Sequence, residues 1–179
     1  KDYGGNDAIL TLPIPGTSMS LGAENSLVID GNIPAVSTVS SFTADGIYSV
    51  GDSIDISVAF NEVVSVSGIP KLTLETGSTD AVIDYVGGSG TSTLIFRFTI
   101  AGGYASSDLN YIDTTALTLN GALIMDAAGN SANLILPHPD STGSLGQEKN
   151  LVVDGGPPLV ISVSSTAVDS SYIIGDTLV

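Results

Sequence analysis

Acidic side chains are the residues of this chain that could do chemistry, and many of them stand in turns. The sequence holds 19 Asp and Glu residues against four Lys and Arg, with one His and no Cys. Carboxylates and turn carbonyls are the oxygen ligands that Ca²⁺ prefers. A chain this acidic either repels itself or recruits cations. We therefore expect Ca²⁺ as a partner.

One group of these side chains is expected to converge at one end of a domain. Asp30 lies in an Asp-Gly linker, and Glu62 ends the run AFNE. Asp126 and Asn130 belong to the turn DAAGN. In a two-sheet antiparallel sandwich, these loops lie at the pole where the first strand starts. We predict that these four residues form a Ca²⁺ site, and that Asp154 is the linker ligand of the next junction.

A second acidic group is expected at the opposite pole. Asp45 and Asp52 lie in the turn after the first strand, with Glu148 nearby. They could add metal ligands at the junction with a following domain. Asp169 and Asp176, which lie 124 residues further along the chain, would do the same in a further repeat of this domain.

These Asp residues also have a reading without metal. An Asx side chain can cap the backbone of its own turn. We favour this reading for Asp45 and Asp52. For Asp30 and Asp126 we favour metal, because carboxylates clustered at one pole repel each other without a cation.

Other functions fit the sequence poorly. The net charge of -15 disfavours nucleic acid, and no apolar run is long enough to span a membrane. The single His138 lies between prolines, so no Ser-His triad or His metal site is expected. Paired carboxylates of a glycosidase remain formally open, but nothing singles out two of them in a cleft. We predict that the chain is not an enzyme.

The sequence repeats itself. Residues 2–55 align without a gap on residues 126–179, at an offset of 124, with 25 of 54 positions identical. This predicts repeats of 124 residues. We expect the C-terminal part of one repeat at 1–32, a complete repeat at 33–156 and the N-terminal part of a third at 157–179.

The complete repeat has the pattern of many short strands. In the best run, Ile54, Ile56, Val58 and Phe60 alternate with smaller or polar residues, which is a period of two. Runs bounded by Gly, Asn, Asp and Ser turns are typical of a two-sheet sandwich. We predict an all-β, immunoglobulin-like antiparallel sandwich. The expected strands are 35–42, 53–60, 63–68, 71–76, 81–86, 93–100, 116–121, 122–126, 133–137 and 151–155.

A series of motifs carries a resemblance over the whole chain. These motifs are SVSSFTADGIYSVGDSIDISVAFNEVVSVSGIPKLTLETG, GSGTSTLIFRFTI, TTALTLNG, DAAGN and SLGQEKNLVVDG. The chain resembles the bacterial immunoglobulin-like repeats of giant secreted adhesins, notably the repeat named after the cyanobacterial swimming-motility surface protein. The resemblance implies an extracellular stalk or filament at a bacterial surface, often steadied by calcium.

We therefore expect a structural module that extends and stiffens a surface protein, with neighbouring repeats of the same chain as partners. One alternative is a self-assembling filament, sheath or surface-layer subunit. In that case the strands at 8–13 or 160–165 would be added to sheets of other copies. Another alternative is a sandwich that binds a glycan or a partner cell.

Overall fold

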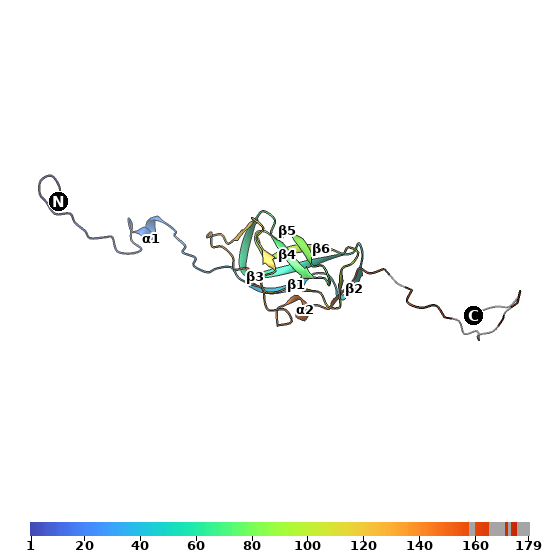
Figure 1. Cartoon of the computed structure of the whole chain (residues 1–179). Coiled ribbons are helices and arrows are strands. Elements are labelled where there is room, and N and C mark those ends of the chain that lie inside the picture. Colours follow the sequence, from blue (N-terminus) through green and yellow to red (C-terminus); the bar gives the residue numbers. More distant parts are fainter. Residues whose placement is uncertain (158–159, 165–170, 172, 175–179) are drawn as a thin grey trace.

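The computed structural model describes residues 1–157, 160–164, 171 and 173–174. Strands make up 38% of the described residues and helices 5%, so the fold is mostly β, as the alternating runs predicted. In Figure 1 the strands form one central body, from which the N-terminal segment leaves at one end and the C-terminal segment at the other. No helix in the described part of the chain is long and apolar enough to cross a membrane.

The elements follow one another as α1 (Leu21–Glu24), β1 (Val36–Ser41), β2 (Gly46–Ser49), β3 (Ser53–Ser67), β4 (Lys71–Glu75), β5 (Ala81–Gly87), β6 (Thr91–Thr99), β7 (Ala105–Ser106), β8 (Asn110–Tyr111), β9 (Leu117–Thr118), β10 (Leu123–Met125), α2 (Leu145–Glu148) and β11 (Leu151–Asp154). The larger sheet has the order β1-β3-β6-β5-β4-β8, with β10 on β3 and β9 on β4. The smaller sheet has the order β2-β11-β7.

Strand β3 organises the larger sheet. It pairs antiparallel with β1 and β6, and its last residues pair with β10. The separate strands expected at 53–60 and 63–68 are wrong, because β3 is continuous from Ser53 to Ser67. Its pairing with β6 shifts register between Ala59 and Val64. Such an irregularity bends a strand without ending it, so Asn61 and Glu62 lie within β3 and not in a turn.

The smaller sheet departs from the sequence-based expectation. Residues 43–52 were expected to be a turn, but they contain β2. The ladder of β2 with β11 is parallel, whereas that of β7 with β11 is antiparallel. The strand expected at 133–137 is reduced to an isolated bridge between Asn133 and Ala35. Alternation within one segment cannot reveal these pairings, because each depends on a partner far away in the sequence.

The core lies between the two sheets and is closed by the last segment of the domain. β4 and β6 contribute Leu72, Leu74 and Phe96, which are fully buried. Leu145 of α2 and Leu151 of β11 are also fully buried. Burying a side chain of this size contributes about 1.5–3 kcal/mol. The C-terminal segment is therefore part of the core.

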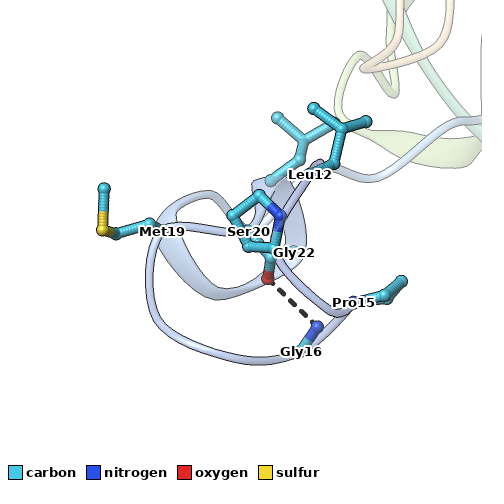
Figure 2. A pocket seen from close by; sticks show the side chains of 8 residues that line it. Leu12, Pro15, Gly16, Met19, Ser20 and Gly22 are labelled. Carbon is cyan, nitrogen blue, oxygen red and sulfur yellow. Dashed lines mark hydrogen bonds between the residues drawn. The ribbon is translucent and has the colours of Figure 1, made fainter. Parts of the chain in front are cut away.

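The two one-turn helices, α1 and α2, were not expected from the sequence. Each follows a Ser and has four residues, too few for a helical hydrophobic period. Before α1 the chain makes a tight loop, in which the Gly16 N–H donates to Ser20 Oγ at 3.0 Å (Figure 2). The side chains of Pro15 and Met19 extend away from this loop, and Leu12 lies where the loop begins. Local hydrogen bonds thus define the conformation of the loop.

The matched pair Leu151 and Leu27 tests how far the closing strand stabilises the fold. Leu151 is 0% exposed, and its counterpart Leu27 in the N-terminal segment is 67% exposed. Leu151→Ala should lower the free energy of unfolding by about 2–5 kcal/mol, because it leaves a cavity. Leu27→Ala should change it by no more than about 0.5 kcal/mol. Urea denaturation of both variants measures the difference, and equal losses would contradict this assignment of the core.

Candidate metal centre

The linker before β1 is fixed to the domain by backbone and amide hydrogen bonds. The Ala35 N–H donates to Asn61 Oδ1 at 2.8 Å, and the Asn61 N–H donates to the Ala35 carbonyl at 3.0 Å. The Asn133 N–H donates to the Pro34 carbonyl at 2.7 Å. These contacts hold the end of the linker beside the bulged part of β3, next to Glu62.

The turn at 126–130 is built around the Asp126 carboxylate. Its Oδ1 accepts from the Asn130 N–H and its Oδ2 from the Asn130 Nδ2, both at 2.8 Å. Gly129 has a φ of 93°, in the region that a glycine adopts without strain. Asn130 Nδ2 also donates to the Asp30 carbonyl at 3.2 Å. The turn is therefore bonded directly to the linker.

Three carboxylates meet at this pole of the domain. One oxygen each from Asp30, Glu62 and Asp126 lies within 4.8 Å of the other two. Asp126 is buried, Glu62 is half-buried and Asp30 is exposed. The three come from the linker, from β3 and from the turn after β10, so only the folded domain brings them together.

The surroundings shift the pKa values of two of these carboxyls in opposite directions. Desolvation raises the pKa of Glu62, and the negative charges of Asp30 and Asp126 raise it further. Burial acts to raise the pKa of Asp126 as well, but the hydrogen bonds from Asn130 and from neighbouring backbone N–H groups outweigh it and lower the pKa. Asp126 is thus held as an anion. A proton on Glu62, or a cation beside it, would relieve the repulsion among the three carboxylates.

Glu62 also has an unsatisfied oxygen. Its Oε1 is buried and accepts no hydrogen bond from the described residues. An ionised carboxylate oxygen buried without a donor is costly unless it binds a cation. Ca²⁺ binds oxygen at about 2.3–2.6 Å, so two ligands on opposite sides of the ion lie about 4.8 Å apart. Three oxygens this close can share one ion, and the all-oxygen donor set fits Ca²⁺ better than Zn²⁺, which prefers nitrogen and sulfur ligands.

Of the other predicted ligands, Asn130 contacts the cluster through Asp126 and Asp30. Asp154 Oδ1 accepts from the Gly156 N–H at 3.1 Å, and Asp30 Oδ1 accepts from the Asn32 N–H at 3.0 Å. These are two equivalent Asx turns. In the described part of the chain, Asp154 belongs to no cluster of three metal-binding side chains.

The acidic residues at the opposite pole have hydrogen-bonding partners of their own. Asp45 Oδ1 contacts Lys149 Nζ at 2.9 Å, and Asp52 Oδ2 accepts from the Ser49 N–H at 2.9 Å. Glu148 Oε1 accepts from the Gly143 N–H at 3.2 Å. Asp52 thus caps its own turn, as the metal-free reading requires, whereas the partners of Asp45 are Lys149 and the Asn150 N–H, far along the chain.

Asp169 and Asp176 lie outside the described residues. Sequence reasoning did not identify Asn61, whose side chain fixes the linker beside Glu62. An Asn inside the strand-like run AFNEVV was its only signal.

Comparison of the chain with protein-family models, with curated proteins and with solved structures finds no match. The candidate site therefore stands on its geometry.

The raised pKa of Glu62 predicts a pH dependence in the metal-free protein. A carboxyl whose pKa is higher in the folded state stabilises the fold fully below its unfolded pKa, and this stabilisation is lost as the pH rises through the folded value. Glu62→Gln should therefore increase stability at pH 7 in a chelator and change it little near pH 4. Urea denaturation at both pH values measures this. Glu75→Gln, at an exposed Glu outside the cluster, is the control; a gain of equal size there would contradict the assignment.

Proposed function

We propose that this chain is part of a tandem array of immunoglobulin-like sandwiches in a bacterial surface or secreted protein. Calcium at each junction fixes one repeat relative to the next. The array extends and stiffens the protein, and it catalyses no reaction. The observation that carries the proposal is the carboxylate cluster, because one of its members, Asp30, comes from the linker and two come from the domain.

The mechanism follows from where the three ligands lie. A short linker between two sandwiches is a pivot. A cation bound by Asp30, Glu62 and Asp126 would neutralise the repulsion among them and tie the linker to the pole of the following domain. An extracellular calcium module typically binds with a dissociation constant of about 10⁻⁴–10⁻³ M. A half-exposed site with three carboxylates fits that range and an extracellular location.

Repeated local geometry supports the array. Asp2 accepts two hydrogen bonds from Asn6 at 2.9 Å, the same pair of bonds that Asp126 accepts from Asn130. The turn that provides Asp126 in this domain is therefore present a second time, at the offset of the sequence repeat. This second turn would provide a ligand at the preceding junction.

The turn before each short helix is also repeated. The Met19 N–H donates to Glu24 Oε1, and at the offset of 124 the Gly143 N–H donates to Glu148 Oε1. Two segments with the same sequence pattern thus form this same hydrogen bond, although only the second is packed in a core.

A calcium titration of the whole chain tests the proposed site. We expect one Ca²⁺ per chain by calorimetry. At a free Ca²⁺ concentration 100 times the dissociation constant, the free energy of unfolding should rise by about 2.7 kcal/mol. Glu62→Gln and Asp30→Asn should each weaken binding by about tenfold or more, because affinity depends on the number of charged ligands.

Asp154→Asn is the matched control, because Asp154 lies in an equivalent Asx turn without the other two carboxylates. It should leave binding by this site unchanged. Nuclear relaxation of the Gly31 and Asn32 amides should show slower linker motion with Ca²⁺ than in chelator. No binding, or binding that Glu62→Gln and Asp30→Asn leave intact, would leave a spacer that does not depend on metal.

A further inference from the structure

Residues 20–31, which we call the donor segment, repeat residues 144–155, which we call the closing segment. The twelve positions are identical except at Ala23, Asn25, Ser26 and Ile29. The apolar side chains of the donor segment are exposed, whereas their counterparts fill the core. The exposed fractions are Leu21 69% against Leu145 0%, Leu27 67% against Leu151 0%, and Ile29 96% against Val153 2%.

Two glycines of the donor segment correspond to glycines that are closely packed in the closing segment. A Cβ on Gly155 would lie 2.6 Å from the carbonyl oxygens of Ala101 and Tyr104, so no side chain fits there. The counterpart, Gly31, has nothing within 4 Å of its Cβ position, yet it is also Gly. Gly22 is likewise open, whereas a Cβ on its counterpart Gly146 would lie 2.9 Å from the Asn110 side chain. The donor segment thus meets the steric limits of a groove that it does not occupy in this structure.

The groove for the closing strand lies between β2 and β7. β11 fills it through backbone pairing on both sides, from Leu151 opposite Gly46 to Asp154 opposite Ser49. The Gly46 N–H donates to the Asn150 carbonyl at 3.1 Å, and the Asn150 N–H donates to Asp45 Oδ1 at 3.2 Å. Backbone groups form these bonds, so residues 26–30 can form them equally well. Only the ion pair of Lys149 with Asp45 is lost, because the donor has Asn25 at that position.

The linker leaves the donor segment little reach toward this groove in its own domain. Ala35 is fixed beside Asn61, and Asp30 would have to lie at Ser49. Along β3 the eight steps from Ser53 to Asn61 span about 26 Å. The five steps from Asp30 to Ala35 span at most about 18 Å. Another sandwich places no such demand on the linker and is therefore the more accessible acceptor.

We propose that the donor segment is a transferable closing strand: it inserts between β2 and β7 of another copy of this chain when that copy's own closing strand is displaced. Leu21, Leu27 and Ile29 then fill the core positions of Leu145, Leu151 and Val153. This is strand addition between copies, with a sandwich of the same fold as partner. This proposal rests on the part of the proposed function in which similar sandwiches repeat along the chain, but it does not require calcium.

One difference sets the N-terminal limit of the donor segment. A Cβ on Gly143 would lie 3.2 Å from the Ser37 carbonyl oxygen, and the donor copy has Met19 at this position. Residues before Ser20 therefore fit the acceptor less well, and the insertion starts at Ser20.

The test uses the whole chain with Leu151→Asp, in chelator. This substitution disables β11 and leaves the donor segment intact, so each molecule can close the next one. We expect concentration-dependent oligomers in sedimentation velocity, while the wild-type chain sediments as a smaller species. Adding Leu27→Asp should abolish this assembly. Adding Leu10→Asp instead should preserve it, because Leu10 is also exposed but lies outside the donor segment.

A synthetic peptide of residues 20–31 provides a second measurement. It should bind the chain that carries Leu151→Asp and Leu27→Asp, and restore its thermal transition. A peptide with Leu27→Asp should bind about 10- to 100-fold more weakly, the loss expected for one buried Leu. Assembly that persists in the double variant, or a Leu151→Asp chain that neither assembles nor responds to peptide, would overturn the proposal. Because no calcium is present, either result leaves the metal site untouched.

Discussion

The continuity of β3 is the constraint on which the rest of the molecule depends. One strand pairs with β1, β6 and β10, and its first half places Ile54, Ile56 and Val58 in the core. The irregularity after Ala59 changes its neighbours without interrupting it. Glu62 therefore sits on a strand that is paired before and after it, so its backbone is held beside the linker and the turn at 126–130.

The electrostatic character of the N-terminal pole follows from this rigidity. Asp126 is held by hydrogen bonds from its own turn, and the end of the linker after Asp30 is held by hydrogen bonds to Asn61 and Asn133. Flexible acidic side chains would separate and remain hydrated. These three are kept close by the fold of the turn, the linker and β3, so a cation can lower the free energy of the fold by binding among them.

The closing segment connects the two proposals. β11 fills the gap between β2 and β7, buries Leu151 and ends at Asp154. Its copy in the N-terminal segment ends at Asp30, which belongs to the carboxylate cluster of the described domain. In an array, the last strand of one sandwich would thus lead directly into the metal site of the next. The strand that completes one core would also carry the junction.

The sequence by itself determined the β class, because a period of two along 53–60 and 93–100 admits no helix, and it determined the internal repeat. It also singled out Asp30, Glu62, Asp126 and Asn130 as a group. Only the tertiary structure decided that β3 runs through Glu62, that β2 pairs in parallel with β11, and that 133–137 is not a regular strand. These features depend on partners far along the chain. The same physical reason explains why Leu27 and Leu151, in nearly identical segments, are exposed and buried: burial belongs to the surroundings and not to the local sequence.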